Sequence, residues 1–364
     1  MTVVGNSLLD IAENYFLQEV KPQAELIDQE VSYLAAALQR MGELNLLALR
    51  ISPEYGGGGL TKLEYHQFQL MISRYSGALA FLQTQHQSAA SLLAAGTNQK
   101  LQQTYLPAMA TGKKLVGVGI SQLRRPNPNI RAELTQAGYE ITGEVPWIAG
   151  WQFFSEFIVA AILADGREIY AIAPLTNAEQ TEGGKITISP PMQLAAMKTT
   201  NTVSAKLQRW RVAEVIAIKP AGTFTKRSKA NILHHGFFAL GCAQAALDII
   251  TTVYQTKQFA FLLTAHQQLN KQLMNCRNQM LEATRKNIPL EKQLNLRATA
   301  INLAGRCSQA AVSASSGAAN FLTHPAQRVY REALMYTVSG QTLEVMAATL
   351  KILASDSEKR FRDE

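Results

Sequence analysis

The sequence predicts a mainly α-helical protein with a β unit at its centre. Helical patterns occupy residues 1–112 and 221–364, whereas residues 113–220 form short runs rich in β-branched residues. The 364 residues can bury a large core, and 47% apolar with 17% charged residues is typical of a globular chain. We therefore expect an N-terminal helical domain over 1–112, a small β-barrel domain over 113–220 and a C-terminal four-helix bundle over 221–364.

The first block reads as amphipathic helices interrupted by one loop. Apolar residues recur at helical spacing through residues 8–16 and 34–41. The run 53–60 contains a proline and four glycines, which cannot continue a helix. Thr61 followed by Glu64 has the spacing of a capping box, at which we expect the next helix to begin. No strand precedes the glycines and no GK[ST] follows, so we interpret them as an interhelical loop rather than a phosphate site.

The central block predicts short strands. Four β-rich runs, at 157–163, 168–173, 185–189 and 215–219, are separated by Asp-Gly, Gly-Gly and Pro-Pro pairs. Asp165-Gly166 is a strong hairpin signal. No helices alternate with these runs, so we expect a small antiparallel barrel or sandwich rather than a parallel sheet.

The last block predicts four long helices with short connections, which indicates a bundle. One starts near Thr223, and periodic stretches follow at about 262–288, 291–322 and 326–355. The tail from Lys351 to Glu364 is mostly polar, and we expect it to fray.

Composition and charge exclude several classes of function. The net charge of +8 is scattered, without the dense basic stripe and interleaved aromatics of a nucleic-acid site, so we expect no nucleic-acid partner. No segment has eighteen uninterrupted apolar residues, so we expect no membrane span. Cys242, Cys276 and Cys307 are odd in number and lack CxxC spacing. They predict buried thiols, no metal site and a cytoplasmic location.

Five motifs in the right order resemble the acyl-CoA dehydrogenase family along nearly the whole chain. They are PEYGGGGL at 53–60, YLPAMATGKK at 105–114, YEITGEVPWIA at 139–149, LGCAQAALD at 240–248 and HPAQRVYREA at 324–333. The resemblance implies that family's fold, with FAD bound between barrel and bundle and a neighbouring subunit completing the site. It also implies hydride transfer from an acyl thioester such as acyl-CoA, and assembly as a homodimer or homotetramer.

The resemblance implies several cofactor contacts, with departures from the family pattern. Trp147 stands where a tryptophan packs on the flavin, Ala149 replaces a hydroxyl residue, and Lys257 replaces an arginine that reaches the partner subunit's FAD. The pyrophosphate loop is shortened to 123–129, where Arg124 or Arg125 substitutes by charge, and Ser316 replaces a glycine. The full set of implied contacts is Ser121, Trp147, Ile148, Ala149, Lys257, Gln268, Gly317 and Thr342.

The carboxylate base of the family is missing at both positions that the resemblance implies. Gly340 stands at one of them and Asn231 at the other, and neither can take a proton from carbon. His234 and His235 follow Asn231 by three and four residues, so they share its helix face, and an imidazole titrating near neutrality can act as base or acid. Glu344 lies one turn beyond Gly340 and is a third candidate, although packing or solvation explains each of the three as well.

Three functions remain open from the sequence. The first is an acyl-CoA dehydrogenase-like flavoprotein oxidoreductase with a substituted or absent base, which needs an electron-transfer partner. The second is a flavin-dependent monooxygenase on the same fold, supplied with reduced flavin by a reductase and needing no carboxylate. The third is a non-catalytic member that binds flavin or an acyl ligand.

Overall fold

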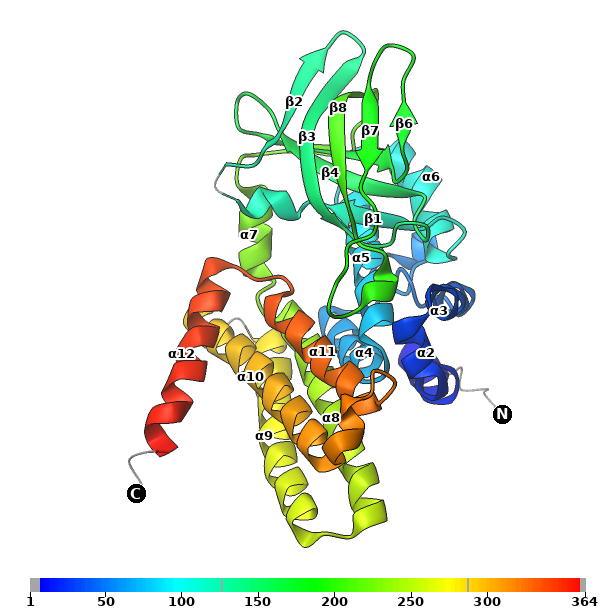
Figure 1. Ribbon diagram of the computed structural model, residues 1–364. Helices are drawn as coiled ribbons and strands as arrows, with labels where there is room; N and C mark the ends of the chain where they lie inside the picture. The colour runs from blue at the N-terminus through cyan, green and yellow to red at the C-terminus, as the bar shows by residue number, and fades with distance from the viewer. Residues whose placement is uncertain (1–6, 126, 287, 361–364) are drawn as a thin grey trace, which may run out of the picture.

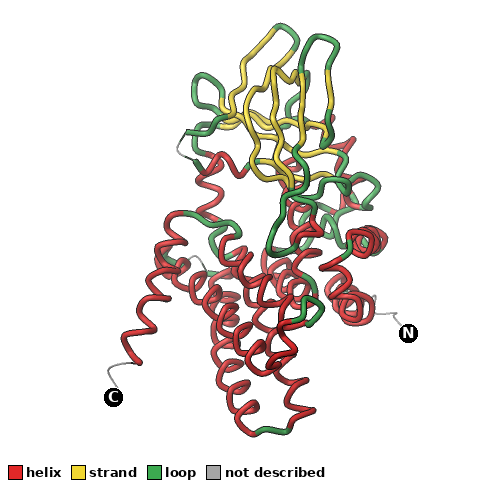
Figure 2. The backbone as a smooth tube through the Cα atoms, viewed as in Figure 1, coloured by secondary structure: helices red, strands yellow, loops and turns green. Residues whose placement is uncertain are grey.

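The computed structural model describes residues 7–125, 127–286 and 288–360, with side chains up to residue 355. The predicted order of helices, sheet and helices is confirmed (Figures 1 and 2). The sheet lies at one end of the molecule, and the long C-terminal helices form the other (Figure 1). The N-terminal helices pack beside both.

The N-terminal block begins each main helix where the sequence supplies a cap. The Thr61 hydroxyl accepts from the Glu64 amide and the Glu64 carboxylate accepts from the Thr61 amide, which confirms the predicted capping box. Ser76 caps the next helix by accepting from Leu79 N–H. The helices are α1 Leu8–Tyr15, α2 Ala24–Gln29, α3 Val31–Glu43, α4 Lys62–Tyr75, α5 Gly77–Ala94 and α6 Gln99–Ala110, with shorter turns at Phe16–Val20, Lys21–Gln23 and Pro53–Tyr55.

The glycine-rich run forms a closed loop between α3 and α4. Its amides already have partners, because Gly58 N–H donates to Ala48 O and Gly59 N–H donates to Ile51 O. A Cβ at Gly58 would lie 3.0 Å from Leu49 O, so the backbone approach itself needs glycine. The loop therefore packs against its own chain, as the sequence predicts, rather than offering amides to a phosphate.

The central block forms a nine-stranded sheet with the order β6-β7-β8-β3-β2-β4-β5-β9, and β1 pairs with β4. The predicted Asp165-Gly166 hairpin joins the antiparallel pair β4 and β5, with Gly166 at φ +84°. Not all pairing is antiparallel, since β1 and a single residue pair of β2 lie parallel to β4. The chain between β1 and β4 crosses over through β2 and β3, and that length permits the parallel pairing. The strands are β1 Val116–Gly119, β2 Ile130–Thr135, β3 Gly138–Ile148, β4 Glu156–Ile162, β5 Glu168–Pro174, β6 Ala178–Glu179, β7 Lys185–Ile188, β8 Val203–Val212 and β9 Ala217–Lys219, with one-turn helices at Ser121–Arg124 and Lys198–Thr200.

The C-terminal helices differ from the prediction at two places. The helix expected from 223 breaks at 231–233, and the helix expected over 326–355 breaks at 339–342. Gly340 has φ +59°, which a right-handed helix cannot contain, and this explains the second break. The helices are α7 Thr223–Ala230, α8 His234–Lys257, α9 Ala260–Arg285, α10 Leu290–Ser315, α11 Pro325–Val338 and α12 Leu343–Arg360, with a one-turn helix at Ser316–Asn320.

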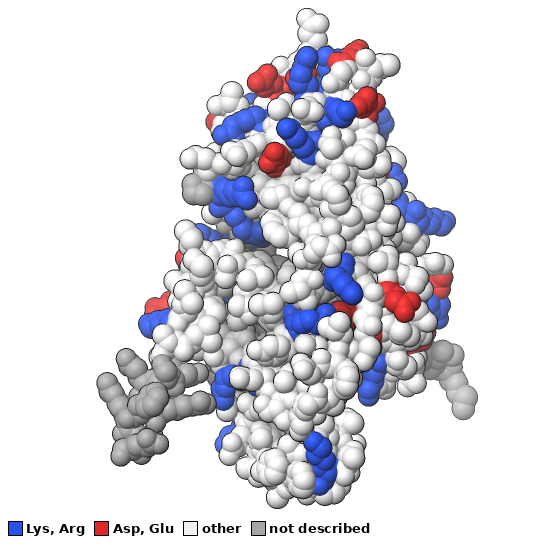
Figure 3. Space-filling model, viewed as in Figure 1, with Lys and Arg blue, Asp and Glu red and all other residues white. Residues whose placement is uncertain are grey.

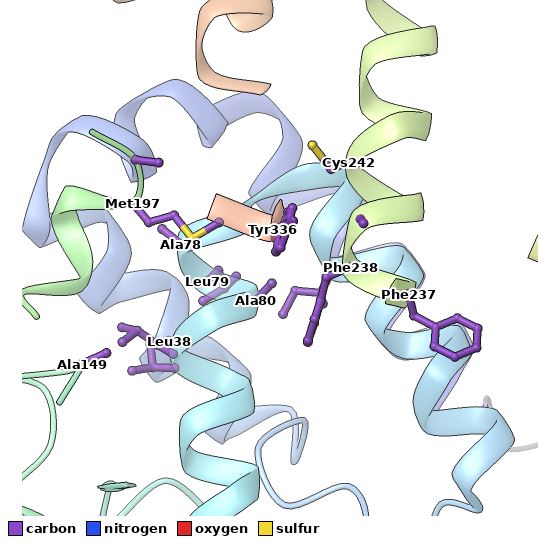
Figure 4. Close-up of a cluster of buried hydrophobic side chains, with 14 of the residues drawn as sticks. Leu38, Ala78, Leu79, Ala80, Ala149, Met197, Phe237, Phe238, Cys242 and Tyr336 are labelled. Carbon is purple, nitrogen blue, oxygen red and sulfur yellow. The ribbon is translucent and has the colours of Figure 1, made fainter. Parts of the chain in front are cut away.

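The main core runs from the N-terminal helices through the sheet into the bundle. Figure 4 shows Leu79 and Ala80 of α5, Phe238 of α8 and Tyr336 of α11 in one cluster. Within the described residues, α8 is long and apolar enough to cross a membrane by length and composition. Its most apolar window is 67% buried inside the protein, where it serves as the central helix of the bundle. Cys242, Cys276 and Cys307 are buried free thiols, as expected.

A buried ionic network joins the N-terminal helices to α11. Glu332, 1% exposed, accepts from Gly77 N–H at 2.9 Å and from Arg328 at 3.0 Å. Beside it, Arg331 donates to Asp28 at 2.6 Å. A Cβ at Gly77 would lie 2.8 Å from the Glu332 carboxyl carbon, so glycine is needed there. The network holds α5 and α11 in a fixed relation, and both helices border the cavity described next.

Candidate functional site

A cavity of about 1170 Å³ lies where the sheet, α5, α7, α8 and α11 meet. The sheet domain contributes Ser121, Trp147 and Ala149, and the bundle contributes the residues around both helix breaks. Asn231 and Gly340, the two positions of the missing carboxylate, both line it. Positions that lie 109 residues apart in the sequence therefore border one space.

Arg297 of α10 ties the two helix breaks together. Its guanidinium is 1% exposed and donates to Ile232 O at 3.2 Å and to Ser339 O at 2.6 Å. It forms no ion pair with a described acid, and burial lowers its pKa to about 9. A buried cation without a carboxylate leaves a positive potential behind the cavity wall.

His235 occupies the space into which a side chain at position 340 would project. A Cβ built on Gly340 would lie 2.6 Å from Nε2 of His235. Ser339 Oγ and His235 Nδ1 are 2.9 Å apart, within hydrogen-bond distance. The imidazole is therefore anchored through Nδ1, beside the backbone position where the family pattern has its base.

His234, which also lines the cavity, belongs to a cluster of polar side chains from α4 and α5. Gln69 Nε2 lies 3.0 Å from His234 Nε2 and Thr84 Oγ1 lies 3.5 Å from it. Tyr65 stacks on the imidazole with ring centroids 5.9 Å apart. Oε1 of the fully buried Gln69 has no hydrogen-bond partner among the described residues. His234 is thus held by side chains of α4 and α5.

Both histidines are neutral at neutral pH. Burial, together with the charge of Arg297, lowers the pKa of His234 to about 3. Burial followed by repulsion from His234 and Arg297 lowers the pKa of His235 well below 6.5. The expectation of an imidazole titrating near neutrality is wrong, because a buried site surrounded by cations disfavours the imidazolium.

Trp147, Ser121 and Ala149 form the sheet side of the cavity. The Trp147 side chain is 51% exposed, which is unusual for a large ring, and it borders the open space. Ser121 Oγ is buried and has no partner among the described residues, so it is available to a ligand. Ile148 points the other way and is fully buried in the core.

The other predicted cofactor residues lie outside the cavity lining. Lys257 Nζ donates to Ala314 O at 3.0 Å and lies 3.5 Å from Ser316 Oγ. This places Lys257 close to Gly317, near the end of the bundle that is farthest from the sheet (Figure 1). Gln268 is on α9, eight residues after the start of that helix, and Thr342, next to the lining residue Gln341, caps α12 by accepting from Val345 N–H. The sequence-predicted contacts therefore divide into two separate groups.

Glu344 and His86 are both engaged elsewhere. Glu344 pairs with Lys229 at 3.0 Å, and its own backbone amide and Lys229 hold its pKa below the usual value. It does not line the cavity. His86 is fully buried, with Nε2 donating to Met109 O and Nδ1 accepting from Val116 N–H. These bonds make it a packing residue that joins α5, α6 and β1.

Sequence reasoning missed the cationic character of the cavity. Arg50 and Arg227 line it together with the predicted Arg124 and Arg125. Arg227 lies in the basic group 226–229, which the sequence does not distinguish from the rest of the scattered positive charge, and nothing near Arg50 singled it out. No cluster of three or more histidine, cysteine or acidic residues that suits a metal occurs in the described part of the chain.

Comparisons with known proteins agree with the geometry. The family model for the acyl-CoA dehydrogenase N-terminal domain matches residues 6–113. A probable acyl-CoA dehydrogenase of Bacillus subtilis is 25% identical over 92% of this chain and 94% of its own length.

Two solved structures share the fold along almost the whole chain. Butyryl-CoA dehydrogenase from Megasphaera elsdenii has a TM-score of 0.79 at 19% identity, covering 95% of this chain and 97% of its own. An acyl-CoA dehydrogenase complexed with FAD from Bacillus anthracis has a TM-score of 0.80 at 19% identity, covering 98% of this chain and 67% of its own. With the motifs, the domain order and the site at the junction of sheet and bundle, these matches show that the chain has the acyl-CoA dehydrogenase fold, and together with the N-terminal family model they support its membership of that family.

Proposed function

We propose that the protein oxidises a CH–CH bond of an acyl thioester with FAD as its cofactor. The observation that carries the proposal is one cavity bordered by Trp147 and Ser121 from the sheet and by His235 and Gly340 from the bundle. Family membership supports the reaction class, and the FAD complex of the Bacillus anthracis relative supports the cofactor.

The sheet side of the cavity fits the flavin ring. Trp147 offers an exposed aromatic face, and Ser121 Oγ is a buried hydroxyl still lacking a partner among the described residues. Arg124 and Arg125 add positive charge beside Ser121 for the phosphate groups. Ala149 offers no side-chain hydrogen bond, so that contact of the family pattern is lost. When bound, FAD supplies the acceptor for the hydride that leaves the β carbon.

His235 is the group we propose as the base for the α proton. With Nδ1–H donating to Ser339 Oγ, the lone pair on Nε2 is free to accept a proton. Because the pKa is low, the imidazole is always in the neutral form that a base requires, but it is a weak base. Arg297, behind Ser339, favours negative charge that develops on the substrate.

A second copy of the chain completes the site in this proposal. Lys257, Gln268 and Gly317 lie away from the cavity, where they are suited to reach the cofactor of a partner subunit. Phe259 and Phe261 near the same end are 50% and 67% exposed, and a partner would bury them. An electron-transfer protein is the expected acceptor of the electrons, and we place the reaction in the cytoplasm.

The visible spectrum of the purified protein tests the cofactor. We expect a yellow protein with one FAD per chain, whose 450 nm band bleaches when acyl-CoA is added without oxygen. His235→Asn keeps a hydrogen bond to Ser339 but lacks a base, so bleaching should slow by about 10²–10⁴-fold while FAD content stays unchanged. Ser339→Ala serves as the comparison for a positioning role, with a smaller loss and an unchanged product.

The remaining functions are distinct outcomes of the same experiment. The absence of any carboxylate among the described lining residues favours the monooxygenase as second candidate. In that case acyl-CoA leaves the flavin oxidised, and product forms only when reduced flavin and oxygen are supplied together. A colourless protein that does not take up added FAD would contradict both enzymatic functions.

A further inference from the structure

A second, smaller cavity lies between four helices, away from the sheet. It is lined by residues of α1, α4, α8 and α9, and none of its described lining residues borders the larger cavity. Its volume is about 310 Å³, at the lower end of the range for small-molecule sites. The function proposed above makes no use of this cavity.

The floor of this smaller cavity is the contact between α4 and α8. A Cβ on Gly241 of α8 would clash with Ser73 Oγ and Leu70 O of α4, so glycine is what lets the two helices approach. Arg74 is fixed across the same contact, because it donates to both carboxylate oxygens of Asp248, at 2.6 and 2.9 Å. The floor is therefore held in place by the protein itself, and a ligand would meet a preformed site.

The two walls carry charges of opposite sign. α1 contacts α4, and α9 contacts both α4 and α8, so α1 and α9 flank the floor. Asp10 and Glu13 line the cavity from α1, and Arg277 lines it from α9. The Asp10 carboxylate also accepts from the Ser7 amide in a capping box. Glu13 and Arg277 have no hydrogen bond or ion pair among the described residues, so both charges are free to bind a ligand.

An apolar surface separates these charges, which distinguishes the cavity from the rest of the exterior. Acidic and basic side chains are interspersed on the face shown in Figure 3, so mixed charge alone is ordinary. Here the apolar lining includes two methionines, whose flexible side chains adapt to the shape of a ligand. The apolar lining residues are Leu9, Leu70, Met71, Leu240, Leu273 and Met274.

We propose that this cavity binds a small zwitterion whose ammonium and carboxylate groups are separated by an apolar body. Glu13, with Asp10 beside it, holds the ammonium end, and Arg277 holds the carboxylate end. The apolar body lies on the α4–α8 floor between them. A simple carboxylate or amine satisfies one wall only, and an α-amino acid, with both charges on one carbon, cannot place one charge at each wall.

Calorimetry with the purified full-length protein tests the site with four probes. They are 6-aminohexanoate, its isomer norleucine with both charges on one carbon, and hexanoate and hexylamine, which each keep one charge. We expect 6-aminohexanoate to bind about ten times more tightly than each of the others, because only it engages both walls.

Two substitutions separate the walls. Glu13→Gln should weaken binding of 6-aminohexanoate and hexylamine by about tenfold and leave hexanoate unchanged. Arg277→Gln should weaken 6-aminohexanoate and hexanoate by a similar factor and leave hexylamine unchanged. Arg285→Gln, an exposed position on the same helix as Arg277 and outside the cavity, is the matched control and should leave all four affinities as they are.

Each other outcome overturns the inference. Norleucine binding as tightly as 6-aminohexanoate would show that the charges need no separation, and hexanoate or hexylamine doing so would show that one wall suffices. An equal loss in Arg285→Gln and Arg277→Gln would mean that the overall charge matters rather than contact in the cavity. If none of the four probes binds, the site does not exist. These results do not depend on the flavin chemistry, since the two cavities share no described lining residue.

Discussion

The imidazole of His235 fills the space that a side chain at position 340 would need. A Cβ on Gly340 would lie 2.6 Å from His235 Nε2, closer than a Cβ carbon approaches an unbonded heavy atom. A side chain at position 340 and the imidazole at position 235 therefore exclude each other in this arrangement.

Gly340→Glu is expected to destabilise the protein rather than restore a base. The new side chain displaces His235, and overpacking of this kind costs about 1–3 kcal/mol in the free energy of unfolding. The double variant Gly340→Glu with His235→Ala provides room for the new side chain. Its free energy of unfolding, measured by urea denaturation, should regain much of that loss. Gly222→Glu controls for the backbone, because Gly222 also has positive φ, at +74°, but no atom within 4 Å of a Cβ. Additive losses in the double variant would show that the two positions do not share one space.

Stability is expected to fall as the pH drops below 6.5. Burial lowers the pKa of His66 to about 2 and that of His234 to about 3, so the unfolded chain takes up protons first. Each histidine then removes about 2 kcal/mol of unfolding free energy between pH 7 and pH 5, and the loss continues towards pH 3. The urea midpoint should depend less on pH across this range in His66→Asn. It should depend on pH as in the wild type in His266→Asn, because the side chain of His266 is partly exposed. A wild-type curve independent of pH would contradict the buried neutral state.

Trp147→Ala is expected to lower FAD occupancy without unfolding the protein. The ring is 51% exposed, so its removal loses little packing, but the flavin loses an aromatic face worth about 1 kcal/mol or more. FAD per chain after gel filtration measures the effect, and Trp147→Phe should recover most of it. Full occupancy in the alanine variant would mean that the flavin lies elsewhere.

Glu332→Ala is expected to cost about 3–5 kcal/mol, because it leaves the Gly77 amide without an acceptor and the buried Arg328 with Glu25 as its remaining carboxylate. Chemical denaturation gives the value. Glu282→Ala, which removes an exposed pair with Lys286, is the matched control and should change stability by less than about 1 kcal/mol. Similar costs for both would mean that the network does not join the domains.

Phe261→Ser is expected to weaken assembly while leaving the fold of the chain intact. The side chain is 67% exposed and stacks on Phe259 at 5.4 Å, so it contributes little to the subunit alone. Light scattering should show a smaller species at low protein concentration, with FAD affinity falling in parallel. Leu134→Ser, 72% exposed on the sheet, is the control. A wild-type monomer at all concentrations would contradict the shared site.

The sequence predicts the domain order well because each part rests on local patterns. The Thr61 cap, the Asp165-Gly166 hairpin and the buried cysteines all depend on residues close together in the chain. The two helix breaks were missed, since the apolar spacing continues through 231–233 and 339–342. Gly340, at φ +59°, ends the second helix locally, and Arg297 from a third helix binds the carbonyls at both breaks, Ile232 O and Ser339 O.

The site was predicted only in part for the same reason. Sequence alone brings His235 near Asn231 but gives no sign that its ring fills the space above Gly340. Nor does it distinguish Arg227, which lines the cavity, from Lys226 and Lys229, which do not. Side-chain charges on one short helix look alike until their surroundings are known.

The bond between Gly77 and Glu332 also constrains how the chain is made. The partners are 255 residues apart, and Asp28 and Arg331 are 303 apart. During synthesis the N-terminal helices leave the ribosome before α11. Until α11 is made, Asp28 and the Gly77 amide therefore lack their partners Arg331 and Glu332. A chain released before residue 325 would lack these partners and leave the surface that α11 covers exposed, so truncated products should be recognised and degraded rather than accumulate as a stable fragment.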